Sequence, residues 1–335
     1  HNKALTSAQL RSVQEVVNDV IKAQLPIYSK SVPLEQGRAV SGLRAVFGEQ
    51  YPDPVRVVSV GTEIPLLLSA EHKESNDLTS SEFCGGTHLS NTGQAGSFII
   101  TEETAVARGI RRISAITGDA ASAAQTTASI WMDRMLKLQQ AADSAKDVDT
   151  EKDVEAQVAL LRTELDTRGD ELVMGLLTKE TVRDGLEANQ RALALRRKKR
   201  MMENAQQSIK QATEEAKAQV SSGARSVVIT MKAGHDNKVL KKAMDELKKA
   251  IPETAFLCVS TTDESMMEDK DDKLSCFAIV PDSVELKADE WVASALSVAG
   301  GRGGGRASMA QGSARGLSNL KAVIAAASDF VMQTI

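Results

Sequence analysis

Hydrophobic positions of both helical and strand periodicity occupy residues 1–118. Apolar residues between Leu10 and Ile21 follow a helical spacing, which predicts a helix that ends before Pro26. A capping-box pattern, Thr6 with Gln9, comes directly before it. β-branched or apolar runs predict strands at residues 55–60, 98–100 and 113–116. We therefore expect a mixed α/β domain in this part of the chain.

The pattern changes between residues 119 and 222. No proline occurs between Pro65 and Pro252, and a set of apolar residues is spaced by four, three and four positions: Val154, Val158, Leu161 and Leu165. This spacing is typical of a coiled-coil seam. Breaks or bends are predicted at residues 167–170 and near Gly175 and Gly185. We expect a long helical coiled-coil linker made of several helices.

A second α/β pattern occupies residues 223–335. Strands are predicted at 226–230, 256–259 and 275–280, and helices at 238–250 and 317–332. The acidic stretch from Asp263 to Asp272 fits the spacing of no calcium-binding loop, so a solvated loop is predicted there. The fold class is therefore an α/β (α+β) domain, a helical linker and a small α/β C-terminal domain.

Composition narrows the class of protein. Lys and Arg total 41 and Asp and Glu total 45, for a formal net charge of −4, which excludes a wholly basic nucleic-acid coat protein. No apolar run is long enough to cross a membrane. Three cysteines do not make a secreted disulfide framework, so we expect a reducing, cytoplasmic compartment. The start, without Met or a signal peptide, indicates a fragment of a longer protein.

The first candidate for chemistry is the pair Cys84 and His88, which are four residues apart. A thiolate and an imidazole at this spacing can ligate one Zn²⁺, and the glycines between them allow the backbone to turn so that the side chains converge. The pair is half of a usual zinc site. The alternative is a buried cysteine and a hydrogen-bonded histidine in an ordinary turn. No trustworthy catalytic nucleophile or carboxylate pair is found, so the catalytic residues stay unassigned.

The second candidate is a glycine-rich stretch near the C-terminus, which we interpret as a loop. It contains Arg302, Gly303, Gly304, Gly305 and Arg306, and Gln311 follows it. Glycines let backbone N–H groups approach a phosphate or sugar, and the arginines add positive charge. The spacing matches neither a P-loop nor a dinucleotide-binding fingerprint. The alternatives are nucleic-acid contact and a flexible linker.

Two further basic segments are candidates for phosphate contact. Residues 196–200 form a run of five basic residues in the helical region, for which a solvated helix face is the alternative. Arg111 and Arg112 stand at the start of a predicted strand. Their alternative is a surface salt-bridging pair.

Four segments together resemble the alanyl-tRNA synthetase family. TSSEFCGGTHLSNTGQAGSF, ARGIRRISAITG and GLRAVFGEQYPDPVRVVSVG resemble its editing domain, and GGRGGGRASMAQG resembles the glycine-rich signature of its C-terminal domain. The order of the segments also matches, and the likeness covers essentially the whole chain. The segment YPDPVRVVSVG is more similar to the eukaryotic cytoplasmic form of the family than to the bacterial form.

The resemblance implies an editing domain at 1–118, truncated at its N-terminus, a linker at 119–222 and a tRNA-binding C-terminal domain at 223–335. The family ligates alanine to tRNA with ATP and Mg²⁺, and its editing domain hydrolyses mischarged Ser-tRNA and Gly-tRNA. Its zinc is held by an H-x-x-x-H pair and a C-x-x-x-H pair. Cys84 and His88 match the second pair, whereas the first pair and the ligation domain lie upstream of this chain.

By this resemblance we expect no ligase activity and an incomplete editing site. The expected partner is tRNA(Ala). The residues expected to bind it are Arg302, Gly303, Gly304, Gly305, Arg306, Gln311, Arg111 and Arg112. Self-association through the linker or the C-terminal domain is also expected. The alternative is a non-catalytic scaffold that binds tRNA or a protein. A phosphoesterase is disfavoured because the chain has no Asp-His-His cluster.

Overall fold

A computed structural model describes residues 3–46, 48–69, 80–168, 171–262 and 272–335. The chain divides into two compact units, one containing residues up to Ser144 together with Val154–Gln190, and one containing Ala145–Asp153 together with Arg191–Ile335. Nearly all of the predicted acidic loop, residues 263–271, lies outside the described residues. Among the described helices, none is both long and apolar enough to cross a membrane.

The first unit begins with the predicted N-terminal helix, α1 (Ser7–Lys22). The Thr6 side chain accepts a hydrogen bond from the Gln9 N–H, and the Gln9 side chain accepts one from the Thr6 N–H, which confirms the capping box. The Asn18 side chain forms two hydrogen bonds with the backbone of Phe98, at 2.8 and 2.9 Å. These bonds attach α1 to the start of strand β4.

A small antiparallel sheet of three strands follows, in the order β1 (Ile27–Val32), β2 (Val55–Val60) and β3 (Ser80–Phe83). The short helices α2 (Leu34–Arg38) and α3 (Ile64–Leu67) connect its parts. Its apolar core contains Val32, Val55, Val57, Ile64 and Phe83. The predicted strand at 55–60 is confirmed as β2, and the burial of four of its six residues makes it a rigid support.

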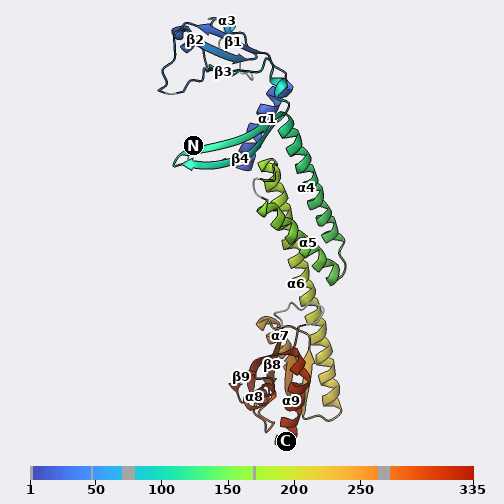
Figure 1. Cartoon of the computed structure of the whole chain (residues 1–335). Helices are drawn as coiled ribbons and strands as arrows, with labels where there is room; N and C mark the ends of the chain where they lie inside the picture. Colours follow the sequence, from blue (N-terminus) through green and yellow to red (C-terminus); the bar gives the residue numbers. More distant parts are fainter. Residues whose placement is uncertain (1–2, 47, 70–79, 169–170, 263–271) are drawn as a thin grey trace. The chain divides into compact units, whose positions relative to one another are not determined.

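A separate two-stranded ribbon is formed by β4 (Phe98–Ala107) and β5 (Ile110–Thr117), after the 3₁₀ turn η1 (Thr92–Ala95) (Figure 1). Both predicted strands are present, and both are longer than expected. The ribbon is buried at Ile99 and Ile100, whereas residues 105–110 are exposed. The sequence did not predict the exposed part of the two strands, because an exposed ribbon needs no alternation of apolar and polar side chains.

Three long helices account for the predicted helical region: α4 (Gly118–Ser144), α5 (Val148–Thr167) and α6 (Leu176–Ser221). The predicted break at 167–170 is confirmed by the end of α5 at Thr167, although residues 169–170 lie outside the described residues, and the one near Gly175 by the start of α6. All four seam residues of α5 are buried, although the supercoil itself stays a prediction. Arg134 of α4 pairs with Glu164 of α5 at 2.7 Å.

A helix break at Gly185 is wrong, because this residue lies inside α6, and a bend there stays a prediction. An added Cβ there would meet the sulfur of Met135 at 2.6 Å. Gly185 is therefore a site of close packing between α6 and α4, which a sequence pattern does not distinguish from a helix break.

The second unit is built on a five-stranded sheet in the order β6-β7-β8-β10-β9. The strands are β6 (Ser226–Met231), β7 (Ala255–Ser260), β8 (Lys273–Ile279), β9 (Arg302–Arg306) and β10 (Met309–Arg315). Only β6 and β7 pair in parallel. The predicted strands at 226–230, 256–259 and 275–280 are confirmed.

Helices cover both faces of this sheet (Figure 1). The C-terminal part of α6 and α7 (Asn237–Ala250) pack against one face, over β6, β7 and part of β8. The opposite face packs against α8 (Ala288–Ser297) and α9 (Leu320–Thr334), the latter preceded by the 3₁₀ turn η4 (Leu317–Asn319). The predicted helices at 238–250 and 317–332 therefore correspond to α7 and to η4 with α9.

The glycine-rich stretch is a strand, β9, and the interpretation as a loop is wrong. It pairs with β10 over its whole length. An added Cβ on Gly303 would meet Val292 of α8 at 2.5 Å, and one on Gly305 would meet the carbonyl oxygen of Met309 at 2.4 Å. These glycines allow α8 and the neighbouring strand to approach closely. Glycines with this packing role look the same in a sequence as the glycines of a flexible loop.

Gly304 differs from its neighbours, because nothing lies within 4 Å of a Cβ added to it. We predict that Gly303→Ala lowers the free energy of unfolding by about 1–3 kcal/mol through overpacking. Gly304→Ala changes it by less than about 0.5 kcal/mol. Urea unfolding of the two variants measures both values. Equal losses would contradict the close packing of α8 on β9.

Candidate metal centre and nucleic-acid surface

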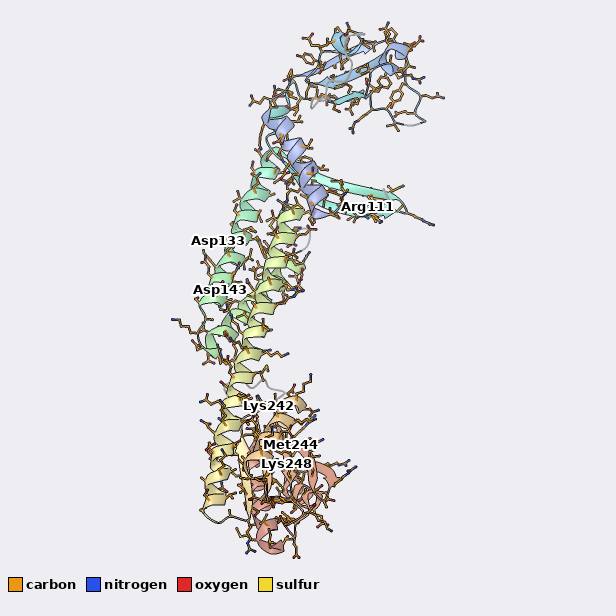
Figure 2. All side chains as sticks on the ribbon, turned by 180° about the vertical axis from the view of Figure 1, so that it is seen from behind. Arg111, Asp133, Asp143, Lys242, Met244 and Lys248 are labelled. Atoms are coloured by element: carbon orange, nitrogen blue, oxygen red, sulfur yellow. The ribbon has the colours of Figure 1, made fainter. Side chains whose placement is uncertain are left out.

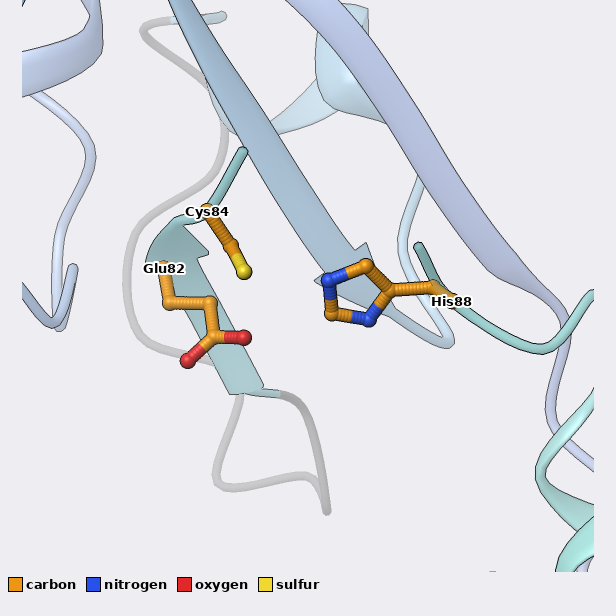
Figure 3. A group of neighbouring side chains, drawn as sticks. All are labelled: Glu82, Cys84 and His88. Carbon is orange, nitrogen blue, oxygen red and sulfur yellow. The ribbon is translucent and has the colours of Figure 1, made fainter. Parts of the chain in front are cut away.

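Three potential metal ligands converge at the end of β3. The carboxylate of Glu82, the thiol of Cys84 and the imidazole of His88 offer ligand atoms that all lie within 4.8 Å of one another (Figure 3). Glu82 and Cys84 are two residues apart at the end of β3, so their side chains point to the same side. His88 joins them because Gly85 and Gly86 let the chain turn back.

Arg56 of β2 holds this turn. Its guanidinium donates hydrogen bonds to the carbonyl oxygens of Cys84, at 3.4 Å, and of Gly86. The backbone N–H of Cys84 in turn donates to the carbonyl oxygen of Arg56 at 3.2 Å. The segment between Cys84 and His88 is thereby attached to the buried strand β2, and the ligand atoms are positioned before any metal binds.

The donor set fits zinc. Zinc binds thiolate sulfur, imidazole nitrogen and carboxylate oxygen at about 2.0–2.3 Å, so donor atoms this close need only small rotations to share one ion. Three protein ligands leave a fourth position for water or substrate. The structure thus brings together both sequence-predicted ligands, Cys84 and His88, and adds Glu82.

Sequence reasoning missed Glu82 and Arg56. The two-residue alternation of a strand ending at Cys84 could have indicated Glu82, since positions 82 and 84 share one side. Arg56 gave no signal, because its contacts join segments 28 residues apart.

The remaining cysteines, Cys258 and Cys276, lie in the core of the second unit. Burial raises the pKa of the Cys276 thiol to about 12, and burial together with the neighbouring Cys276 raises that of Cys258 well above its usual range. Both thiols are therefore protonated at neutral pH and inert, whereas Cys84 is half-exposed.

The structure separates the two arginines of β5. Arg111, which Figure 2 labels, lies on this ribbon. It forms an ion pair with Glu103 of β4, and their side chains are 18% and 5% exposed. The hydrogen bond from Arg111 lowers the pKa of the Glu103 carboxyl. Arg112 is exposed on the ribbon. The salt-bridge alternative therefore describes Arg111, and Arg112 stays a candidate for RNA contact.

The residues of β9 and β10 divide between the two faces of the sheet. Gly303 lies against Val292 of α8 and Gly305 against Met309 and Ala310 of β10, whereas the alternate positions Arg302, Gly304 and Arg306 face the other way. All five residues of β9 are exposed. Gln311 of β10 pairs with Gly304 and is exposed on the same face. The predicted contact residues thus include three exposed polar side chains on one face.

The basic run 196–200 lies on α6. Arg200 pairs with Glu151 at 2.9 Å, and Lys199 lies 3.9 Å from Glu203. These pairs agree with the alternative of a helix face whose charges are balanced by neighbours.

Two family descriptions match the chain. Residues 55–114 match the threonyl and alanyl tRNA synthetase second additional domain, and residues 223–333 match the DHHA1 domain. The first segment includes β2, β3 and the three potential ligands, and the second includes β9 and β10.

Curated relatives match along the chain. The cytoplasmic alanine–tRNA ligase of Caenorhabditis elegans is 32% identical over all of this chain and 34% of that protein, and that of Dictyostelium discoideum is 33% identical over 98% and 33%. The mitochondrial alanine–tRNA ligase of Saccharomyces cerevisiae is 48% identical over 38% of this chain and 13% of that protein. The chain spans about a third of the length of the cytoplasmic relatives.

Among solved structures, the C-Ala domain of Aquifex aeolicus alanyl-tRNA synthetase is 20% identical, with a TM-score of 0.23 over 31% of this chain and 89% of that one. The matches to the two domains, in this order, and to cytoplasmic relatives over the whole chain agree with the resemblance found in the sequence. The chain is therefore homologous to the C-terminal part of alanyl-tRNA synthetase, the part that holds the second additional domain and the DHHA1 domain.

Proposed function

We propose that this chain carries the proofreading and tRNA-binding functions of an alanine–tRNA ligase. The observation that carries the proposal is the convergence of Glu82, Cys84 and His88 within the segment that matches the second additional domain. The substrates are mischarged Ser-tRNA and Gly-tRNA, and the reaction is hydrolysis of the ester at the terminal ribose. ATP and Mg²⁺ serve ligation elsewhere in the longer relatives. We assign the protein to the cytoplasm, because the relatives that match along the whole chain are named as cytoplasmic enzymes.

The need for hydrolysis follows from substrate size. A pocket that accepts alanine cannot strongly reject glycine, which is smaller, or serine, which adds only a hydroxyl. A second site that removes the wrong amino acid corrects this weakness. In this chain Glu82, Cys84 and His88 would hold zinc, and Arg56 orients the turn that carries them. When bound, zinc supplies Lewis-acid polarisation of the ester or lowers the pKa of a bound water.

Binding of tRNA(Ala) is assigned to exposed basic surfaces in both units. Arg302, Arg306 and Gln311 present donors on one face of β9 and β10, and Arg112 adds a charge on the ribbon. Arginine and amide side chains are common donors to phosphate and sugar oxygens. We retain the three-part division at residues 118 and 222, with self-association through the helical region or the C-terminal domain.

Zinc binding can be measured through the thiol of Cys84, because the other two thiols are buried with raised pKa values. We predict that zinc protects the folded chain from alkylation at Cys84. Glu82→Gln raises the zinc concentration needed for half-protection by about tenfold, since one charged ligand is lost. Glu102→Gln, an exposed carboxylate outside the cluster, leaves it unchanged. Equal protection in both variants would exclude Glu82 as a ligand.

Hydrolysis is tested with the zinc-loaded chain and mischarged Ser-tRNA(Ala). The resemblance alone implied an incomplete site, but Glu82 adds a third potential ligand to Cys84 and His88, so we predict release of serine faster than in buffer. This excess is lost in Cys84→Ala because the site then lacks its thiolate. Serine release after rapid quenching is the measurement. Unchanged hydrolysis in Cys84→Ala would contradict the metal role. Binding of tRNA without any hydrolysis would favour the non-catalytic scaffold.

RNA binding is tested by its dependence on salt. The logarithm of the association constant falls with the logarithm of the salt concentration, by about 0.9 for each phosphate contact in a duplex. We predict that Arg306→Gln and Arg112→Gln each reduce this slope by about one contact. Lys22→Gln serves as a control, since Lys22 pairs with Asp19 on α1. Slopes identical to that of the unchanged chain would remove these two arginines from the interface.

A further inference from the structure

The ribbon of β4 and β5 is anchored near its base and continues beyond its anchors to an exposed tip (Figure 1). Two side chains of α1 bond to the backbone of Phe98 and Ile100, at 2.8 to 2.9 Å. Further along, Glu103 of β4 and Arg111 of β5 form their ion pair across the ribbon. Residues 105–110, which include the turn between the strands, are all exposed. The tip is therefore held by the ribbon while its side chains stay open to solvent.

Apolar and basic side chains share this tip. Ile110 is 58% exposed and Val106 is 51% exposed. The strand register pairs Arg112 with Thr104, and the two-residue alternation of a strand places Ile110 on the same face as Arg112. Arg108 and Arg112 are both exposed, the former in the turn. Two exposed aliphatic side chains thus lie close along the chain to two exposed guanidinium groups.

The charge of this segment is one-sided. Between Glu103 and Asp119 the sequence contains three arginines and no acidic residue. The ion pair with Glu103 uses Arg111, which leaves Arg108 and Arg112 as the exposed cations of the tip. A surface that combines exposed cations with exposed aliphatic groups suits a ligand that is itself anionic at its borders and less polar between them.

We propose that the tip of this ribbon docks in the minor groove of an RNA duplex, an inference that rests on the proposed function for RNA as the ligand. The minor groove of A-form RNA is wide and shallow, whereas its major groove is too deep and narrow for side chains to read. Paired strands lie about 4.8 Å apart, so a two-stranded ribbon is narrow enough to enter a groove. Ile110 and Val106 then pack against riboses, and Arg108 and Arg112 reach the phosphates that border the groove.

A protein partner fits the tip less well. A stable protein interface uses about 20–30 residues on each side. The tip offers the six exposed residues at 105–110 together with Arg112, and its exposed charges are both positive. Contacts to phosphate weaken with added salt, whereas apolar contacts to ribose do not depend on it in this way. The two kinds of side chain can therefore be tested separately.

Fluorescence anisotropy of a short RNA duplex, titrated with the full chain at several salt concentrations, tests the proposal beside a DNA duplex of the same sequence. We expect the RNA duplex to bind more tightly. Ile110→Ser weakens RNA binding by about five- to tenfold, because an apolar contact is lost, and leaves the salt slope unchanged. Arg108→Gln instead lowers the slope by about one phosphate contact. Ile130→Ser is the matched control, since Ile130 lies on α4 and is 55% exposed.

A third variant reverses the sign of the effect. Glu102 pairs with Ser114 and lies on the same face as Arg112, one step further from the tip. Glu102→Gln therefore strengthens RNA binding, because it removes an acidic group that repels the phosphates nearest to Arg112. A urea midpoint for each variant shows that the chain is folded.

Equal affinity for the RNA and DNA duplexes, or equal RNA binding by Ile110→Ser and Ile130→Ser, would overturn the proposal. A smaller species in sedimentation of Ile110→Ser, with unchanged RNA affinity, would assign the tip to a protein interface and overturn it as well. Failure of the proposed function shows separately. Serine release together with unchanged RNA binding in Ile110→Ser contradicts this inference alone, whereas the expected duplex binding without serine release contradicts only the proofreading.

Discussion

The anchoring of one turn to one buried strand is the constraint on which the candidate chemistry depends. Arg56 projects from β2 and binds the carbonyl oxygens of Cys84 and Gly86, while the backbone of β2 accepts the N–H of Cys84. Val57 and Val58 on that strand are almost fully buried, so the turn is attached to a closely packed and therefore rigid part of the structure. A thiol, an imidazole and a carboxylate are thereby held close enough to share an ion, which is the preorganisation that a hydrolytic site needs.

The second unit uses glycine for a different purpose. Gly303 and Gly305 allow α8 and β10 to lie against β9, which leaves the alternate positions of the same strand for Arg302 and Arg306. One five-residue strand therefore lies close to α8 and β10 on one side and carries two arginines on the other. Two-residue alternation explains how a stretch of almost pure glycine and arginine can be structural on one side and a candidate for RNA contact on the other.

Sequence alone predicted most elements of this fold, because their cores follow simple periods. Strand β2, the capped helix α1 and helix α7 all carry regular apolar spacing, and the Cys84–His88 pair carries a recognisable ligand spacing. Gly185 and the β9 strand were misinterpreted, because the sequence does not distinguish a glycine needed for close packing from one that breaks a helix or forms a loop. The role of Arg56 depends on contacts between distant segments, and a short-range sequence pattern carries no information about them.

The convergence of three ligands from this chain is the central claim, and X-ray absorption at the zinc edge of the metal-loaded protein tests it most directly. The account predicts one sulfur neighbour at about 2.3 Å, with nitrogen and oxygen neighbours at about 2.0–2.2 Å. The sulfur signal should vanish in Cys84→Ser. A zinc environment with no sulfur neighbour, or one unchanged by that substitution, would contradict it.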